Sequence, residues 1–467
     1  MKITLSTLSR ALASATLLNL ACMGVLNAQQ VSEAIKNQAA ELREQALNSE
    51  LAWDVLESLT TEVGPRLAGS PADAKAVAWG VAKFKELGFD KVWTEPVTIP
   101  VWRRIHEKAA IVAPFPQAVT VTALGSSVST PKGGLMADIV HFASYEALLA
   151  APAGSANGKI VYISNKMERH PSGRGYGKVG PGRFLGAAEA AKKGALGLII
   201  RSVGTDSQRS PHTGMTNYQD GVVKIPAAAL SNPDADQLDR ILARQQKVTL
   251  KLDLLTETAA QTLSYNVIGE ITGSERPQKI VAIGGHLDSW DLGTGAVDDG
   301  AGIAITVAAA KLIAEQQRPK RTIRVVMFAA EEIGVYGGKQ YALDHHSELS
   351  NHIIGAESDG GAGSVLALSS NIGQQALPAL DAMLALMAPL GIVRSDEVAS
   401  GSADFGAMVE AGMPAVGLEQ DHSEYFDIHH TPDDTLNKVH PEQLAQNVAA
   451  WAIFVKIAAD WSGRFDR

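Results

Sequence analysis

Residues 279–316 read KIVAIGGHLDSWDLGTGAVDDGAGIAITVAAAKLIAEQ, and this stretch indicates how the chain folds. The apolar run 279–284 has the length of a buried strand, and residues 302–316 have the apolar spacing of a helix. The same alternation continues, with expected strands at 322–330, 353–357, 365–369 and 414–419 and expected helices at 336–345, 374–387 and 441–461. Continuous apolar strands that alternate with helices predict an α/β fold, in which a mixed, mostly parallel sheet is flanked by helices.

The first half of the chain has a different pattern of apolar residues, glycines and prolines. Residues 31–61 and 72–87 are predicted helices, and residues 92–101, which contain two prolines, are an expected edge strand. From residue 119 to residue 255, short apolar runs are separated by Gly, Pro and Ser, which predicts a strand-rich module inserted into the main domain. The expected organisation is a main domain in two parts, 29–118 and 256–467, with the insert at 119–255.

The sequence of the insert shows no catalytic constellation. Its glycine-rich segment 173–182 lacks the Lys-Ser/Thr ending of a phosphate-binding loop, so we predict a flexible loop there. Histidines outside the expected strand ends are interpreted as surface or helix-end residues; they are His106, His141, His170, His212, His345 and His346.

The first 28 residues have the pattern of a secretory signal peptide. Lys2 and Arg10 precede an apolar run at 11–26, and a short exit ending at Ala28 follows it. The run is shorter than the roughly 20 residues that a transmembrane helix needs. We therefore expect a cleaved leader, a secreted or periplasmic protein, and no membrane span. Cys22, the only cysteine, lies in this leader, which leaves the mature chain without disulfides or cysteine-bound zinc.

Composition argues against several other classes of protein. The chain has 467 residues, of which 46% are hydrophobic and 19% are charged, as in a soluble globular protein. Its formal net charge of −9 provides no basic surface for nucleic acid or for an anionic membrane. The sequence contains no Gly-x-Ser-x-Gly, so the main signal of a serine hydrolase is missing.

Acidic and imidazole side chains gather at the expected strand ends and in neighbouring loops. They occur in five segments, which are His286-Leu-Asp288, Asp298-Asp299, Glu331-Glu332, Glu357-Ser-Asp359 and His429-His430. Carboxylates at one edge of a sheet repel one another unless protons or cations neutralise them. Imidazoles mixed with carboxylates, without thiolates, suit zinc, with cobalt or manganese as competitors. A carboxylate that bridges two such ions is a recurring arrangement in hydrolases.

The order of these residues suggests individual roles. His286 and Asp288 alternate on a strand end and so face one side, which lets His286 bind a metal while Asp288 orients it or anchors the loop. One residue of the pair Glu331-Glu332 is expected to reach a metal, and the other to act as general base toward the bound water.

Several motifs together resemble the M28 family of co-catalytic zinc exopeptidases, and in particular its plasma glutamate carboxypeptidase (carboxypeptidase Q) branch. The matching segments are His286-Leu-Asp-Ser-Trp-Asp291, Gly295-Ala-Val-Asp-Asp-Gly300, Ala330-Glu-Glu332, Glu357-Ser-Asp359 and His429-His-Thr-Pro-Asp-Asp-Thr435. The segments Gly64-Pro-Arg-Leu-Ala-Gly-Ser70 and Ser402-Ala-Asp-Phe405 are similar to further family motifs, and the insert is similar to a protease-associated domain. The resemblance implies the zinc exopeptidase fold, a peptide substrate and a homodimer.

The resemblance also implies roles for single residues. One zinc ion would be held by His286, Asp298 and Asp359, and a second by Asp298, Glu332 and His430, with Asp298 as the bridge. Glu331 would be the general base, Asp288 the support of His286, and the peptide bond between Asp298 and Asp299 would be cis. Asp299 replaces the more common Asn of the family. His429 stands where many relatives have Tyr, so either His429 or His430 is the ligand.

Substrate contacts are expected from three further side chains, which are Tyr425, Asp404 and His429. Tyr425 is expected to steady the tetrahedral intermediate, and Asp404, Asp421 or Glu424 to bind a free α-amino group. We predict a secreted di-zinc exopeptidase that hydrolyses dipeptides or short peptides by a metal-activated water, as an aminopeptidase, carboxypeptidase or dipeptidase. Two alternatives stay open, which are a di-metal amidohydrolase acting on non-peptide amides and a non-catalytic binding module of the same fold.

Overall fold

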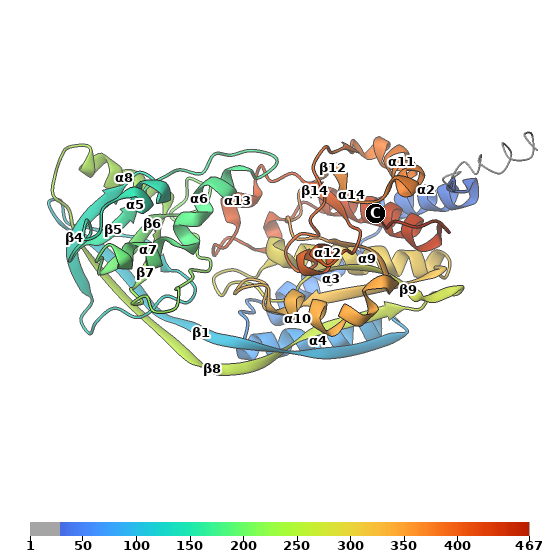
Figure 1. Ribbon diagram of the computed structural model, residues 1–467, viewed down its shortest axis with the longest axis horizontal. Coiled ribbons are helices and arrows are strands. Elements are labelled where there is room, and N and C mark those ends of the chain that lie inside the picture. Colours follow the sequence, from blue (N-terminus) through green and yellow to red (C-terminus); the bar gives the residue numbers. More distant parts are fainter. Residues whose placement is uncertain (1–28, 467) are drawn as a thin grey trace, which may run out of the picture.

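The computed structural model describes residues 29–466, so the predicted signal peptide, residues 1–28, lies outside the described residues. The chain forms two lobes that share two very long strands (Figure 1). β1 (Lys91–Ala113) and β8 (Thr249–Ile271) each have 23 residues and pair antiparallel along most of their length. This ribbon runs from one lobe to the other in Figure 1, and one 11-stranded sheet extends through both.

The main lobe has the predicted α/β architecture. β11 (His352–Glu357), β9 (Arg276–His286), β10 (Arg321–Phe328) and β8 lie side by side in that order. β9 is parallel to both of its neighbours, whereas β10 and β8 are antiparallel. One face packs against α2 (Glu33–Leu47), α3 (Leu51–Ser58), α4 (Pro71–Glu86), α9 (Ala301–Gln316) and α14 (Pro441–Asp460). The other packs against α10 (Tyr336–Asp344) and α12 (Gly406–Glu410), which confirms a mixed sheet flanked by helices.

Both faces of the sheet in the main lobe are buried. Val281 and Ile283 of β9 pack into the core that contains α9 and α14. The intervening Ala282 packs into a different core, together with Phe328 and with Tyr341 of α10. All eight residues of β10 are buried. Apolar side chains of these strands therefore point to both faces, and the polar residues of β10, which are Arg321, Thr322 and Arg324, are buried with hydrogen-bond partners.

The remaining elements of the main lobe are short. A second sheet contains β13 (Val393–Arg394), β12 (Val365–Ser370) and β14 (Val416–Gln420), and the helices α11 (Leu377–Met387) and α13 (Tyr425–Ile428) complete the lobe. Short π-helical or 3-10 segments occur at Leu59–Val63, His346–Asn351, Gln374–Ala376, Ala388–Leu390 and Leu436–Lys438. Ala296–Gly300 form an irregular turn in which Asp298 and Asp299 have non-helical backbone dihedrals. Within residues 29–466 no helix combines the length and the hydrophobicity needed to cross a membrane.

We call the second lobe the insert lobe. Its sheet contains β4 (Leu135–Phe142), β5 (Ile160–Ile163), β6 (Gly197–Arg201) and β7 (Ala227–Leu230), which run parallel, and β3 (Val121–Ala123), antiparallel at the edge. Its helices are α5 (Tyr145–Ala150), α6 (Gly175–Phe184), α7 (Gly186–Lys192) and α8 (Asn232–Leu242), and β2 (Gln117–Val119) pairs with β1. The expected boundary after residue 255 falls inside β8, and the division into domains stays a prediction.

The prediction of a flexible loop at 173–182 is wrong, because most of this segment is in helix α6, which buries Val179. Gly175 lies so close to the main chain that an added Cβ would be 2.3 Å from the carbonyl oxygen of Glu168. Gly182 faces the side chain of Ile163 in β5 at van der Waals distance. Close packing of small residues therefore outweighs the low helix propensity of glycine.

The parallel strands of the main lobe place their carboxyl ends at one edge of the sheet. His286 and Glu357 are the last residues of β9 and β11, and Glu331 lies three residues beyond the end of β10. Helices α13 and α6 lie next to each other between the lobes in Figure 1, where the rings of Phe426 and Tyr176 stack with centroids 5.2 Å apart. The insert lobe therefore reaches the region of the strand ends.

Candidate metal centre

A first group of side chains meets around His286, at the end of β9. The Nε2 atom of His286 lies 3.0 Å from Oδ1 of Asp298, which precedes α9, and 3.5 Å from Oδ1 of Asp359, which follows β11. All three side chains offer donor atoms that lie within 4.8 Å of one another. This arrangement is compact enough to hold one metal ion.

A second group meets at the other oxygen of Asp298. Its Oδ2 atom lies 3.3 Å from Nε2 of His430, and the same nitrogen lies 3.0 Å from Oε2 of Glu332. Asp298 therefore directs one oxygen to each group, and all five side chains that the sequence suggested as ligands lie in one continuous cluster. The peptide bond between Asp298 and Asp299 is cis, as expected.

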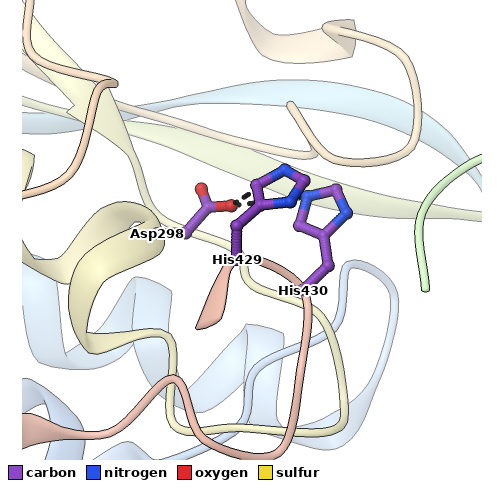
Figure 2. Close-up of side chains that lie close together, drawn as sticks. All are labelled: Asp298, His429 and His430. Carbon is purple, nitrogen blue, oxygen red and sulfur yellow. Dashed lines mark ion pairs between the residues drawn. The ribbon is translucent and has the colours of Figure 1, made fainter. Parts of the chain in front are cut away.

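His429 also faces this second group. Figure 2 shows the carboxylate of Asp298 pointing toward the two imidazoles, whose rings stack with centroids 3.5 Å apart. The Nε2 atom of His429 is 3.9 Å from Oδ2 of Asp298, compared with 3.3 Å for His430. The Nδ1 atom of His429 is buried and has no hydrogen-bond partner within residues 29–466. His430 differs from His429 in its additional contact with Glu332.

The cluster contains more negative charge than its imidazoles can balance. Burial raises the pKa of Glu331 well above its usual range, and the carboxylates of Asp359 and Glu332 raise it further. Burial alone would lower the pKa of His430, but Glu332 and Asp298 beside it raise that pKa to about 9. The Oε1 atom of Glu332 is buried without a hydrogen-bond partner in the described part of the chain. Carboxylate oxygens without hydrogen-bond partners, beside imidazole nitrogens, are the kind of donor set that divalent metals such as zinc use in proteins.

Asp288 supports the first group in two ways. Its backbone carbonyl oxygen lies 3.0 Å from Nδ1 of His286, and its side-chain Oδ1 accepts a hydrogen bond from the backbone N–H of Glu331 at 3.0 Å. The side-chain contact to His286 is longer, at 3.7 Å. Asp288 thus orients His286 mainly through its backbone, while its carboxylate, whose pKa burial raises to about 7, fixes the position of Glu331.

Two supporting residues had no role in the sequence-based interpretation. Asp434 accepts hydrogen bonds from the backbone N–H groups of Val297 and Asp298, at 2.7 and 3.2 Å. Arg66 is completely buried and donates to the carbonyl oxygens of Leu287, Thr294 and Gly295. These carbonyls belong to the loop that joins His286 to Asp298, so Arg66 fixes the shape of that loop. Arg66 and Asp434 both lie in quoted motifs, but nothing local indicated their partners.

A cleft of about 400 Å³ opens over the cluster. Asp298, Glu331, Glu332 and Asp359 line it from the main lobe, together with Tyr425, His429 and His430. Asp404 does not line the cleft: it is fully buried, and its Oδ1 accepts a hydrogen bond from Gly338 at 2.8 Å. Asp421 and Glu424 line a different, smaller pocket beside Tyr425.

The insert lobe contributes several side chains to the same cleft, which the sequence did not reveal. They are Tyr176, Arg183, Phe184, Met215 and Asn217. The three from α6 belong to or border the glycine-rich segment, which was the one local sign that this part of the insert is unusual. The cleft is therefore shared between the lobes.

The interpretation of His212 as a surface or helix-end residue is wrong. His212 is fully buried, with Nε2 at 2.6 Å from Oδ2 of Asp206 and Nδ1 at 2.6 Å from the carbonyl oxygen of His429. The next residue, Thr213, donates its backbone N–H to the carbonyl oxygen of His430 at 3.0 Å. The insert lobe thus supports the backbone of both candidate histidine ligands. The contacts with His429 and His430 join residues 217 positions apart, so no local pattern could indicate them.

Comparisons with known proteins show the family of the chain. A family model described as "Peptidase family M28" matches residues 266–455. Carboxypeptidase Q from Homo sapiens is 37% identical over 410 residues, which cover 88% of this chain and 85% of that protein. The mouse protein of the same name is 35% identical over 437 residues, covering 93% of this chain and 90% of that protein.

Solved structures show the same similarity. A peptidase M28 precursor from Shewanella amazonensis has a TM-score of 0.91 and 51% identity, covering 93% of this chain and 99% of that chain. BSAP, a zinc aminopeptidase from Bacillus subtilis, has a TM-score of 0.64 at 22% identity, covering 89% of this chain and 96% of that chain, and it shares the fold.

Proposed function

The chain belongs to peptidase family M28 and is a metallopeptidase, and from this premise we propose that it is a secreted di-zinc exopeptidase for dipeptides or short peptides. The observation that carries the proposal is the position of Asp298, whose two carboxylate oxygens face two separate groups of donor atoms. A carboxylate placed in this way is suited to bridge two metal ions.

We assign the ligands by these two groups. His286, Asp298 and Asp359 would hold one ion, and Asp298, Glu332 and His430 the other. The contact of His430 with Glu332, at 3.0 Å, supports His430 over His429 as the ligand. When bound, two zinc ions supply Lewis acidity, which polarises a peptide carbonyl and lowers the pKa of water. Cobalt or manganese can bind the same kinds of ligand.

Glu331 is the proposed general base. It lines the cleft beside the ligand Glu332, and its backbone is held by the carboxylate of Asp288. Its carboxylate takes a proton from the attacking water while the carbon–oxygen bond forms, and it then passes that proton to the leaving amine nitrogen as the carbon–nitrogen bond breaks. The products are one free carboxylic acid and one free amine.

Tyr425 and His429 are the proposed substrate contacts from the main lobe. Both line the cleft directly beside the candidate ligands. Burial raises the pKa of Tyr425 well above its usual value, so its hydroxyl stays protonated. The hydroxyl can therefore donate a hydrogen bond to the carbonyl oxygen as negative charge develops on it.

Metal analysis combined with a substrate panel tests this function. We expect about two zinc ions per folded chain, loss of activity with a chelator, and recovery on addition of zinc. The panel contains free dipeptides, longer peptides blocked at either end, N-acyl amino acids and non-peptide amides. Cleavage of the last two classes without cleavage of dipeptides would favour the amidohydrolase, and a folded protein that binds no metal would favour the non-catalytic module.

Secretion and dimer formation are separate proposals with their own measurements. The basic start and apolar run of residues 1–28 support a cleaved leader. The mature N-terminus, determined on protein from the periplasm or the medium, is expected near Gln29. Sedimentation analysis of the mature protein is expected to give twice the mass of one chain.

A further inference from the structure

A second cavity lies at the edge of the main-lobe sheet opposite the candidate metal centre. Arg276, Arg321 and His352 line it, and they are the first residues of β9, β10 and β11. His286, at the candidate metal centre, pairs with Phe328 at the other end of β10. At about 3.3 Å per residue, the length of β10 separates the two ends by roughly 20 Å. The cavity is therefore separate from the cleft between the lobes.

Three cationic side chains line this cavity, and none of them forms an ion pair within residues 29–466. They are Arg276, Lys279 and Arg321. Their hydrogen bonds go to neutral oxygen atoms, which belong to Ser350, Asn351, Ala458, Trp461, Ser462 and Gly463. Neutral acceptors satisfy the N–H groups that they contact, but they do not balance the positive charge.

Arg321 is the most buried of these three side chains. The residue is 4% exposed, and its Nε atom has no hydrogen-bond partner in the described part of the chain. Burial and the neighbouring charge of Arg276 lower the pKa of Arg321 to about 10. A buried charge that faces a like charge is unfavourable unless an opposite charge joins them. A negative charge in the cavity would supply that partner.

The carboxylates of this region already have cationic partners. Asp466 lines the cavity but lies 2.5 Å from Arg464, and Asp460, near Arg321, lies 2.8 Å from Lys456. The hydrogen bond from Arg464 lowers the pKa of Asp466 most, and the charge of the nearby lysine of β9 contributes less. Because each acid has a base of its own, the described residues leave positive charge in excess in the cavity.

The C-terminal segment 461–466 holds the two guanidinium groups in place. Arg321 donates to the carbonyl oxygen of Gly463 at 2.6 Å, and Arg276 donates to that of Trp461 at 3.3 Å. The segment is itself anchored by Phe465, which is 1% exposed and whose ring centroid lies 5.1 Å from that of Trp461. The carbonyl oxygen of Phe465 accepts the backbone N–H of Gly373 at 3.0 Å. A ligand that used these cations would therefore not need to order them first.

We propose that this cavity binds a tetrahedral oxyanion, a phosphate or sulfate group, at Arg276, Lys279 and Arg321. Guanidinium groups form paired, charged hydrogen bonds with such groups. An anion with two charges also offsets more of the positive charge than a carboxylate or a chloride does. The site is distinct from the proposed peptidase centre and does not depend on it.

The size and lining of the cavity admit more than a bare ion. Its volume of about 610 Å³ lies within the range of pockets for small molecules. Apolar side chains complete the lining, and they are Leu349, Ile353, Pro414 and Phe465. The oxyanion can therefore be free or be carried by a small organic molecule, and the experiment has an arm for each source.

Calorimetric titration of the metal-loaded protein tests the inference. The probes are inorganic phosphate, inorganic sulfate and phenyl phosphate, with sodium chloride at equal ionic strength as the reference. Phosphate and sulfate are expected to bind saturably and more tightly than chloride, and phosphate is expected to raise Tm. Tighter binding of phenyl phosphate than of inorganic phosphate would assign the site to an organic ester, and equal or weaker binding would assign it to the free ion.

Substitutions of the lining cations locate the bound anion. Arg276→Met and Lys279→Met are each expected to weaken phosphate binding about 10- to 100-fold, by the loss of charged hydrogen bonds. Both variants should cleave peptides as the wild type does, because the cavity is remote from the cleft. Arg321→Met tests the buried charge, and if it does not fold, the two more exposed variants carry the test.

Arg318→Met is the matched control. Arg318 lies just before β10 and does not line the cavity, and it has its own partner in Asp90 at 2.5 Å. The substitution makes the same change of charge and is expected to leave the affinity for phosphate unchanged.

Two outcomes would overturn the inference. A wild-type protein that binds phosphate and sulfate no more tightly than chloride has no such site. Phosphate binding that is unchanged in Arg276→Met and Lys279→Met, but is lost on removal of the metal, would place the anion at the candidate metal centre instead. Neither outcome bears on the proposed peptidase function.

Discussion

Arg66 illustrates how one side chain organises the residues between two candidate ligands. Its three guanidinium nitrogens donate to three carbonyl oxygens of the loop between His286 and Asp298. We predict that Arg66→Met destabilises the protein by about 3 kcal/mol or more, because three buried acceptors lose their partner. Urea denaturation measures the change. Arg103→Met, on the exposed side of β1, is the control and should stay within about 0.5 kcal/mol of the wild type.

Substitution of Glu331 can distinguish an effect on the catalytic step from an effect on metal binding. Glu331→Gln keeps the size of the side chain but removes its ability to accept a proton. We predict that kcat falls about 10²- to 10⁴-fold while the zinc content per chain is unchanged. Glu410→Gln, at the exposed end of α12, is the control and should retain full activity. Near-normal turnover by Glu331→Gln would remove Glu331 from the role of base.

The ligand candidates could be predicted from the sequence because of where they lie along the chain. His286 ends β9 and Asp359 lies two residues beyond the end of β11, and parallel strands end at the same edge of a sheet. Arg183 and His212 could not be predicted, because they reach the site only through the contact between the lobes. Asp404 was named from a motif, yet its fully buried position keeps it out of the cleft.

At the scale of elements, β11 and α10 enclose a buried imidazole that makes stability depend on pH. His352 begins β11, and its Nε2 atom accepts a hydrogen bond from the hydroxyl of Tyr341 in α10 at 2.8 Å. Burial and the nearby charge of Arg324 lower the pKa of His352 to about 3. His345 lies at the end of α10, as one of the two sequence-based interpretations had it, and it is buried rather than on the surface, with its ring centroid 5.7 Å from that of His352.

This lowered pKa gives a signed prediction. Below its ordinary pKa near 6.5, His352 takes up a proton in the unfolded chain but stays neutral in the folded chain until about pH 3. Its contribution to stability is therefore complete above pH 6.5 and is lost as the pH falls, by about 2 kcal/mol at pH 5. The free energy of unfolding of His352→Gln, measured between pH 8 and pH 4.5, should fall less steeply than that of the wild type. The exposed control His346→Gln should follow the wild-type curve.

The ends of helices and strands could be predicted where the element is buried on both sides, but not where one side is exposed. The helix expected at 302–316 is α9 (Ala301–Gln316), and the strand expected at 322–330 is β10 (Arg321–Phe328). The expected edge strand at 92–101 is instead the first part of the 23-residue β1. Its middle is partly exposed and carries a mixed pattern, and its length is set by pairing with the distant β8.

At the scale of the whole molecule, the insert lobe is part of the candidate metal centre. His212 and Thr213 contact the backbone of His429 and His430, the latter in the left-handed region with φ of 61°. We predict that His212→Ala weakens zinc binding about 10- to 100-fold, because it removes the donor that positions this loop. Chelator competition measures the affinity. His212→Asn, whose amide can replace the donor, should recover part of it, and a wild-type affinity in His212→Ala would contradict this role.

The ribbon of β1 and β8 also determines how the two lobes unfold on heating. Proteins whose lobes are joined by a flexible connector commonly melt in stages. Here the paired strands β1 and β8, whose register shifts at three places, pass between the lobes as part of one sheet, so neither half can lose its sheet while leaving the edge of the other intact. Scanning calorimetry of the metal-free protein should accordingly give a single, cooperative endotherm, and two resolved peaks would contradict this view. If either lobe were produced as a separate fragment, it would expose a strand edge with unpaired backbone N–H and C=O groups, which is a known cause of aggregation.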